Sequence, residues 1–491
     1  MAYATLPGID LRLEGAPLEA AYLRGLEGLT IRRRANAPAE LSLRITGVGL
    51  PSSALTPGKS VTLAADGGPL FDGLIAGFEY QERADGSGVL TVEARDQLHI
   101  LATRSSVRAH LDLDVLALAD ELGRDLGLRA RYRETIPPRR RLEQQQQSDL
   151  DVLASAAERV GLHFTLRGRV IEFFNSKGNE EPVVPLHAAA DLLEFRVRST
   201  GNVPDPLSVA GWSPSLAREV RGQARSPSNG ASGSRASGGA GSVLLNELLE
   251  DERDADSLAG AELDRRRGTA LSIDGTTIGD PRLEPGRRVR IEGTLAAFGG
   301  THVVTDVTHR FDPESGFVSS FATAPPESRR APARLSATFG VVSRIDDPLR
   351  LGRVRVQSPA AGDLESDWLA VVTPGAGLGK GVVSLPDLGD RVLVLLLGGE
   401  SGDGLVLGGL YGDHSPPDHD AGHRRFSFVS PGGQRLTLDD QRAGARLEVA
   451  NGTFLDLTSS AATLHASTDL VIEAPGRTLT IRAARIDFEQ G

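Results

Sequence analysis

The chain has 491 residues, a formal net charge of -11, no cysteine and only 4% aromatic residues. A chain of this length is expected to hold about three or four domains. The acidic balance argues against nucleic acid as the main partner, because neutralising phosphates requires a basic surface. Without cysteine the chain has no disulfides and no thiolate chemistry, so folding in a reducing cytoplasm is the natural expectation.

The first residues, MAYATLPGIDLRLEGAP, do not place a basic segment before an apolar one, so we expect no signal peptide. The longest apolar run is Val392–Leu397, which is far too short to span a membrane. If the protein leaves the cell, we therefore expect another machine to carry it.

Residues 1–100 alternate apolar and polar side chains in short runs separated by turn signals such as Pro57-Gly58, which predicts a first β-barrel-like domain. Residues 101–160 read as a helical connecting segment. One helix is expected to begin at Asp112 or Asp114, and a second at Ser148-Asp149. The basic and then Gln-rich residues 137–147 between them are expected to form a loop.

Strands are expected again at LHFTLR and VIEFF, within a second β-barrel-like domain at 161–325. Residues 222–242 are a low-complexity Gly/Ser/Ala segment and are expected to be mobile. Residues 246–267 are expected to form a helix that is acidic at its start and basic at its end. That polarity complements the helix dipole, so the carboxylates need no catalytic explanation.

An internal repeat relates the two barrel-like regions. Leu55-Thr-Pro57-Gly58 through Leu63 matches Leu283-Glu-Pro285-Gly286 through Ile291, and the offset of about 228 residues persists downstream. A period this long excludes a solenoid and favours two related domains in one chain. Chance similarity between β-turn patterns is the alternative.

Residues 334–412 follow a Pro-rich linker and contain about five strands in a short span, which predicts a small Greek-key barrel such as an OB-fold. Val392–Leu397 is expected to be a fully buried strand, and Trp368 is expected to pack in the core. Residues 375–381 resemble a phosphate-binding loop only faintly, because the first Gly and the Ser/Thr of that motif are missing.

The final segment, 424–491, consists of strands too short to fold alone. Apolar residues come in i, i+2 pairs with polar residues between them: Leu436 and Leu438, Leu447 and Val449, Leu455 and Leu457, Leu470 and Ile472, Leu479 and Ile481, Ile486 and Phe488. A single sheet of such strands leaves its apolar face in water, and repeat units of this kind need neighbours. We therefore expect several chains to form an intertwined β-prism; a β-solenoid or sandwich edge is the alternative.

The 334–412 segment resembles the OB-fold of spike proteins from contractile injection machines, which include the VgrG proteins of type VI secretion and the spikes of contractile phages and phage-tail-like particles. The ordered set that carries the resemblance is Gly340-Val341-Val342, Asp347-Pro348, Leu351 to Val356, Asp367-Trp368-Leu369, Pro374 to Gly377, Leu385 to Val394 and Val406 to Tyr411. The hub of that family is similar to Gln147 to Phe164 and to Pro285-Gly286 through Phe311.

The resemblance implies a mainly β, multidomain homotrimer: two β-barrel-like hub domains with a few helices, an OB-fold and a C-terminal triple-stranded β-helix, or prism. It implies a pseudo-sixfold ring of six barrels on a hexameric inner tube protein, with baseplate proteins as further partners. The ten apolar residues from Leu436 to Ile481 given above would form the trimer core of the spike. Ile486 and Phe488 would seat a PAAR-like tip protein.

Some relatives carry a lysozyme domain between barrel and rod, whereas only Gly412 to Arg425 lies there in this chain. We therefore expect no enzyme, no catalytic residue and no cofactor. His414, His419 and His423 have a spacing that suits a metal, but they lie in a Pro-rich connector without a zinc motif, so a solvated neck loop is the favoured interpretation.

The leading hypothesis is a structural hub and spike that joins a sixfold tube to a membrane-puncturing needle, carries effector cargo, and is delivered outward as part of a phage-tail-like particle assembled in the cytoplasm. An OB-fold adhesin or ligand-binding module is the first alternative and a cell-wall hydrolase spike the second. The type of injection machine, its cargo and its target membrane stay open.

Overall fold

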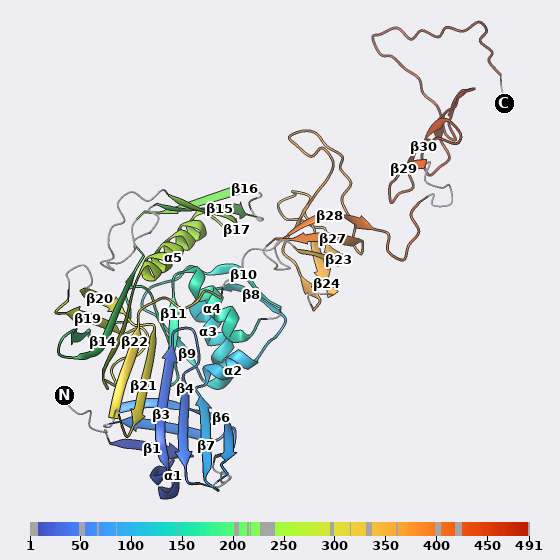
Figure 1. Cartoon of the computed structure of the whole chain (residues 1–491). Coiled ribbons are helices and arrows are strands. Elements are labelled where there is room, and N and C mark those ends of the chain that lie inside the picture. The colour runs from blue at the N-terminus through green and yellow to red at the C-terminus, as the bar shows by residue number, and fades with distance from the viewer. Residues whose placement is uncertain are drawn as a thin grey trace. The chain divides into compact units, whose positions relative to one another are not determined.

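The computed structural model describes residues 8–489 except for 49–54, 66–67, 85, 146, 201–205, 214–215, 217, 226–240, 295–298, 315, 330–335, 360–361, 398–403 and 418–424. The chain divides into two compact units, Met1–Gly409 and Leu410–Gly491. Both are built mainly of strands, as predicted (Figure 1). Among the described residues, no helix combines the length and apolar character that crossing a membrane requires.

The first unit is organised around one sheet of eleven strands in the order β14-β18-β22-β21-β3-β4-β7-β6-β5-β1-β2. The strands are β1 (Ile9–Leu13), β2 (Ala16–Pro17), β3 (Leu26–Arg34), β4 (Glu40–Thr46), β5 (Ser60–Ala65), β6 (Gly68–Glu82), β7 (Gly88–Arg95), β14 (Leu192–Ser199), β18 (Leu271–Ile278), β21 (Asp306–Asp312) and β22 (Gly316–Ala322). The short helix α1 (Ala20–Arg24) precedes β3.

Alternation along these strands places one face in the core. In β4, Leu41, Leu43 and Ile45 are buried while the intervening residues are not. This is the two-residue period that the sequence predicted. The two barrel regions keep separate cores: one holds Leu29 and Ile31 of β3, and the other holds Val307 and Phe321. The sheet therefore runs continuously across two domains.

The internal repeat is visible in the strand order, because β14-β18-β22-β21 has the same connectivity as β3-β4-β7-β6. The register shifts also correspond: β3 has one between Leu26 and Gly28, and β14 has one between Leu192 and Glu194. At the Pro-Gly turns, Gly58 N–H donates to Ile75 O at 2.8 Å and Gly286 N–H donates to Val304 O at 2.8 Å. Phe298, part of the predicted repeat, lies outside the described residues.

The connecting segment contains α2 (Leu98–Thr103), β8 (Arg108–Leu113), α3 (Val115–Gly123), a 3-10 turn (Arg124–Leu126), β9 (Arg129–Arg131), β10 (Arg139–Gln144) and α4 (Asp149–Arg159), followed by β11 (His163–Arg167) and β12 (Val170–Phe174). Asp114 and Ser148 cap α3 and α4 with side-chain oxygens, as their spacing predicted. The loop expected at 137–147 was wrong, because residues 139–144 pair with β8.

The second barrel region adds β13 (Val184–His187), β19 (Arg288–Glu292) and β20 (Gly300–Val303), and a separate sheet of β16 (Arg218–Ala224), β15 (Leu207–Ser213) and β17 (Ser242–Leu248) that packs on α5 (Glu252–Ala270). The helix expected at 246–267 was misplaced: residues up to Leu248 continue β17. Asp251 then caps α5 by accepting from Asp254 N–H, so the acidic residues lie at the true N-terminus. Residues 226–240 of the low-complexity segment lie outside the described residues.

The OB domain is a six-stranded sheet in the order β25-β24-β23-β27-β28-β26. Its strands are β23 (Ser336–Arg344), β24 (Arg355–Ser358), β25 (Leu364–Glu365), β26 (Ala370–Val371), β27 (Arg391–Leu396) and β28 (Gly404–Leu410). β27 was expected to be buried on both faces, but only alternate residues such as Val392 and Val394 are buried. One face of this strand is therefore turned away from the core.

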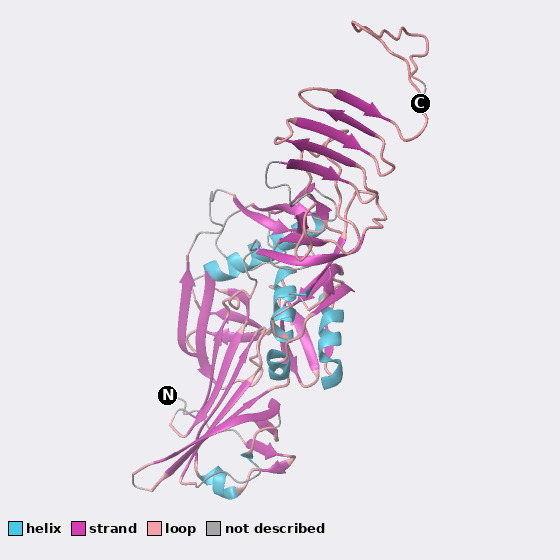
Figure 2. Ribbon diagram, turned by 90° about the vertical axis from the view of Figure 1, so that its right-hand side faces the viewer, coloured by secondary structure: helices cyan, strands magenta, loops and turns pink. Residues whose placement is uncertain are grey.

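The second unit contains an antiparallel meander of β29 (Arg425–Val429), β30 (Arg435–Asp439), β31 (Gly444–Glu448), β32 (Phe454–Leu457) and β33 (Ala462–His465). Figure 2 shows these strands as successive rungs of one ladder. Each of these strands pairs with its neighbour in the same chain. In the intertwined prism expected from the sequence, strands would instead pair with those of other chains. Strands were also expected around Leu470, Leu479 and Ile486, but residues 466–489 form none within this chain.

The two Pro-Gly turns supply a matched pair of variants. Gly286 and Gly58 both have positive φ, 87° and 91°, but a Cβ on Gly286 would lie 2.8 Å from Phe174 whereas a Cβ on Gly58 meets nothing within 4 Å. Gly58→Ala should cost about 1 kcal/mol from backbone strain. Gly286→Ala should cost about 1–3 kcal/mol more from overpacking. Urea unfolding of both variants tests this, and equal losses would contradict it.

Candidate functional site

The meander carries an apolar face that this chain leaves uncovered. The strand registers align two rows across all five strands: one is Phe428, Leu436, Leu447, Leu455 and Leu464, and the other is Phe426, Leu438, Ala445, Leu457 and Ala462. The large residues of both rows are 39–63% exposed. A contiguous exposed apolar face of this kind marks an interaction surface.

The opposite face of the meander is polar and internally paired. Arg425 donates to Asp439 at 2.7 Å, and Arg446 donates to Glu448 at 3.1 Å. The Arg446 guanidinium also lies 3.8 Å from the centre of the Phe454 ring. Because its charges are already compensated, this face needs no partner, whereas the apolar face does.

The remaining residues predicted to form the spike core or tip seat are also exposed in the isolated chain: Val449, Leu470, Ile472, Leu479, Ile481, Ile486 and Phe488. Phe488 is the most open of them. None belongs to a strand of this chain. Their assignment to a trimer core and a tip seat stays a prediction.

Three consecutive arginines of β10 connect different parts of the first unit. Arg139 pairs with Glu250 before α5 at 3.4 Å. Arg140 pairs with Asp367 of the OB domain at 2.7 Å, and Arg141 donates to Glu365 O at 2.7 Å. Sequence reasoning missed these contacts, because a basic run beside glutamines is typical of a solvated loop. The only signal was the alternation within RRRLEQ.

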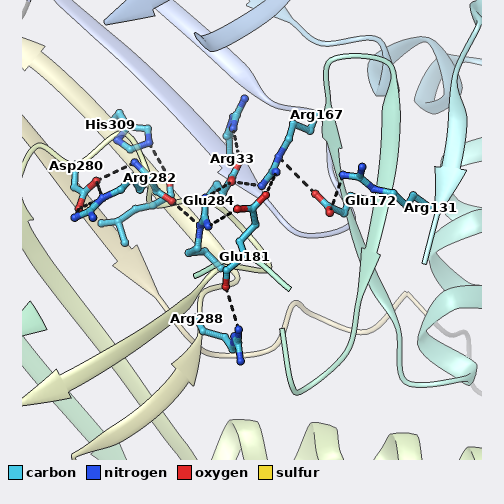
Figure 3. A network of polar contacts seen from close by, with 12 residues as sticks. Arg33, Arg131, Arg167, Glu172, Glu181, Asp280, Arg282, Glu284, Arg288 and His309 are labelled. Atoms are coloured by element: carbon cyan, nitrogen blue, oxygen red, sulfur yellow. Dashed lines mark hydrogen bonds and ion pairs between the residues drawn. The ribbon is translucent and has the colours of Figure 1, made fainter. Parts of the chain in front are cut away.

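A second ionic cluster is centred on Glu284, which is 8% exposed (Figure 3). Arg33 of β3 approaches one carboxylate oxygen at 3.3 Å, while Arg287 at 3.3 Å and Arg167 of β11 approach the other. Burial lowers the pKa of Arg33. One carboxylate therefore holds guanidinium groups from the first barrel, the connecting segment and the second barrel.

The cluster extends on both sides of Glu284. Glu181 accepts from Arg167 at 2.9 Å and from Arg287 at 3.1 Å, and Glu172 pairs with Arg131 at 3.0 Å (Figure 3). His309 is buried nearby, and desolvation lowers its pKa to about 4. The ring is therefore neutral near pH 7. Its Nε2–H donates to Leu283 O, since a carbonyl only accepts, and its Nδ1 accepts from Ser319 Oγ–H.

The OB domain has its own buried ion pair at residues that carry the resemblance. Both oxygens of Asp347 accept from the Arg353 guanidinium, at 2.7 and 3.1 Å, and the carboxylate also accepts from Leu349 N–H and Leu351 N–H. Hydrogen bonding from Arg353 is the main reason that the pKa of Asp347 is well below its usual range. Asp347, Gly352 and Arg353 therefore form one rigid turn.

The structure gives no support to a metal site within the part of the chain that it describes. No group of three or more His, Asp or Glu there has a metal-binding arrangement. His414 is exposed and lies 3.7 Å from Asp413. The other two candidates, His419 and His423, lie outside the described residues. Trp368 is 8% exposed, with the Arg355 guanidinium 5.1 Å from its ring centre, so it packs in the domain as expected.

The hub sheet, the OB domain and the ladder-like C-terminal meander together resemble the fold of VgrG-like spike proteins of the phage-baseplate and type VI secretion class. A model described as the type VI secretion system/phage-baseplate injector OB domain matches residues 338–411. The chain belongs to the family of the Alg8 N-terminal domain, whose model matches residues 51–312, more than half of the chain.

A stretch of 85 residues is 39% identical to the spike protein of Escherichia phage P2. It covers 17% of this chain and 38% of the phage protein, so the match spans well under half of that relative.

Three solved structures share the fold. The Escherichia coli c3393 protein, described as a type VI secretion component similar to the T4 tail proteins gp27 and gp5, is 15% identical with a TM-score of 0.51, over 82% of this chain and 99% of that one. The 43 kDa tail protein of prophage MuSo2 from Shewanella oneidensis is 13% identical with a TM-score of 0.52, and the match covers 65% of this chain and 98% of that one. A chain of the Francisella PdpA-VgrG complex is 8% identical with a TM-score of 0.54, and the match covers 93% of this chain and 79% of that one.

Removing the charge of Glu284 should destabilise the hub strongly. Glu284→Gln leaves three partly buried guanidinium groups without their shared carboxylate, and breaking a buried pair costs about 3–5 kcal/mol. Asp306→Asn removes the partner of the half-exposed Arg32 in the same sheet and should cost about 1 kcal/mol or less. Chemical denaturation measures both, and similar losses would show that Glu284 does not hold the domains together.

The Asp347 pair should make the OB domain sensitive to acid. A carboxylate whose pKa is depressed in the folded state stabilises the fold above its unfolded pKa, and this contribution is lost as pH falls through the folded pKa. Asp347→Asn should lower the free energy of unfolding by about 3 kcal/mol at pH 7. Below pH 4, the stability of this variant should depend less on pH than that of the wild type. Asp346→Asn, next to it but exposed, is the control, and melting curves from pH 2 to pH 7 make the comparison.

Proposed function

We propose that the protein is a non-enzymatic, homotrimeric hub and spike at the tip of the inner tube of a contractile injection system. The observation that carries this proposal is the bare apolar face of the meander. Covering a half-exposed leucine is worth about 1 kcal/mol, so covering both rows on three chains supplies ample energy for association. Three meanders with their apolar faces inward make a closed prism that leaves the paired polar faces in water.

The hub would join a hexameric inner tube protein and baseplate proteins to this prism. Two similar barrels per chain provide six around a threefold axis, which suits a sixfold tube. The residues after the meander, from Leu470 to Ile481, would continue the trimer core by pairing between chains. Ile486 and Phe488 would then seat a PAAR-like tip protein at the end that punctures the target membrane.

The two ionic clusters support a mechanical role. Arg140 and Arg141 tie the connecting segment to the OB domain, and Glu284 ties that segment to both barrels. Force applied to the hub would thus pass to the OB domain through these ionic contacts as well as through the covalent linker. The assembled particle would be delivered outward on contraction, with effector cargo attached where the machine uses it.

A ligand-binding OB-fold is the weaker function, because recognition of nucleic acid or sugar by this fold relies on exposed aromatic platforms. Trp368 is buried in this domain. Glycan arrays and nucleic-acid shift assays test this alternative, and a peptidoglycan turbidity assay tests a hydrolase spike.

The trimer and its core are tested together. Light scattering should give about three times the 51.9 kDa mass of one chain. Leu447→Asp places three carboxylates in one apolar layer, and burying unpaired charges costs several kcal/mol, so the variant should lose the trimer or melt far lower. Thr437→Asp introduces the same charge on the polar face, opposite Arg446, and should behave like wild type. A monomeric wild type, or an unaffected Leu447→Asp, would contradict the proposal.

A further inference from the structure

The eleven-stranded sheet has two strand edges that pair with no further strand within the described part of the chain. β14 is the terminal strand of the sheet. At the other side, β5 pairs with residues 68–74 of β6, so residues 77–82 have β7 as their only neighbour. Free edges of this length are templates for pairing with another strand, and natural proteins usually cover them.

The chain already contains one example of how such edges meet. β21, the last strand of one four-strand repeat, pairs antiparallel with β3, the first strand of the other. At this internal junction His309 lies opposite Ile31 and Phe311 opposite Leu29, and all four side chains are buried. Arg32 adds an ion pair to Asp306 at 2.8 Å.

The two free edges are the counterparts of the two strands that meet there. The shared register shifts align Leu26 of β3 with Leu192 of β14, and hence Arg32 with Arg198. The matching Pro-Gly turns align Ile75 with Val304, and hence Glu79 of β6 with Thr308 of β21. The counterpart of β21–β3 is therefore a pairing of β6 with β14, which do not pair with each other within this chain.

We propose that β14 of one copy pairs antiparallel with residues 77–82 of β6 in the next copy, in the register of the internal junction. Phe78 then lies opposite Ser199, Glu79 opposite Arg198, and Tyr80 opposite Val197. The contact between Glu79 and Arg198 joins opposite charges directly across the strands, an arrangement that stabilises a sheet. Neither side chain has an ion-pair partner among the described residues.

Exposure at the equivalent positions supports the same register. Val307 is fully buried at the internal junction, whereas its counterpart Phe78 is 41% exposed at the free edge. Tyr80 and Val197 are only partly buried, whereas their counterparts His309 and Ile31 are fully covered. The free edges therefore show the exposure expected of an interface whose second half belongs to another molecule.

This contact is heterologous, because each copy offers β14 on one side and β6 on the other, and such contacts form a closed ring when the rotation between copies closes. The inference rests on the trimer proposed above, and it adds which strands join the hub sheets of neighbouring copies and in which register they pair. The hub sheet would then run unbroken around the ring, alternating internal and intermolecular junctions of the same kind.

Cysteine pairs test the register in full-length protein, since the natural chain has no cysteine. Residues directly opposite in an antiparallel pair have Cα atoms about 4.5–5.5 Å apart, within disulfide range. Glu79→Cys with Arg198→Cys should give covalent dimers and trimers on a non-reducing gel after mild oxidation. Glu79→Cys with Glu194→Cys, four residues along the same strand, should stay monomeric on that gel.

The internal counterpart, Thr308→Cys with Arg32→Cys, shows whether this pair position accepts a disulfide, and it should crosslink within one chain. A charge swap gives a second measurement: Glu79→Arg should lower the melting temperature, and adding Arg198→Glu should restore it. A threefold mass without intermolecular crosslinking and without rescue by the swap would overturn the register and leave the spike proposal standing. A monomeric wild type would overturn both.

Discussion

The structure depends on one constraint: a β-sheet cannot leave an apolar face or a long free edge in water without cost. This chain breaks that rule at both ends. Its C-terminal meander exposes two complete apolar rows, and its hub sheet has two strand edges, on β14 and on residues 77–82 of β6, that pair with no further strand. The first unit also has buried cores in the barrels, the connecting segment and the OB domain. The open surfaces are therefore best understood as parts of an assembly.

The buried ion pairs serve a different purpose from the apolar cores. A buried pair contributes little net stability, because desolvation offsets much of its Coulomb attraction, but a bidentate guanidinium fixes relative orientation. Glu284 and the β10 arginines act where separate cores meet, and Asp347 acts where the OB sheet turns. Apolar contacts tolerate sliding, whereas these contacts do not, and a particle that transmits force benefits from that difference.

Sequence reasoning predicted much of this fold because its signals were local. Alternation identified most strands, and Asp114 and Ser148 identified the starts of α3 and α4. The failures occurred where tertiary contacts decide. Residues 139–144 have a loop-like composition, but they form a strand because their backbone pairs with β8. Their three arginines find partners in Glu250, Asp367 and the backbone carbonyl of Glu365. Glu284 carried no signal in sequence, since its three partners are distant along the chain.

The duplication also bears on how the six barrels of the proposed trimer would form a threefold rather than a sixfold object. The two Pro-Gly turns have the same backbone hydrogen bonds, but the residue before the proline is Thr56 in one and Glu284 in the other. The glutamate recruits Arg33, Arg167 and Arg287 and fixes its barrel against the connecting segment, with Gly286 held against Phe174. Threonine carries no charge with which to hold these guanidinium groups. A single carboxylate thus distinguishes two otherwise similar barrels. In the proposed trimer the ring would keep a sixfold outline for a tube, while the connecting segments and OB domains would follow threefold symmetry.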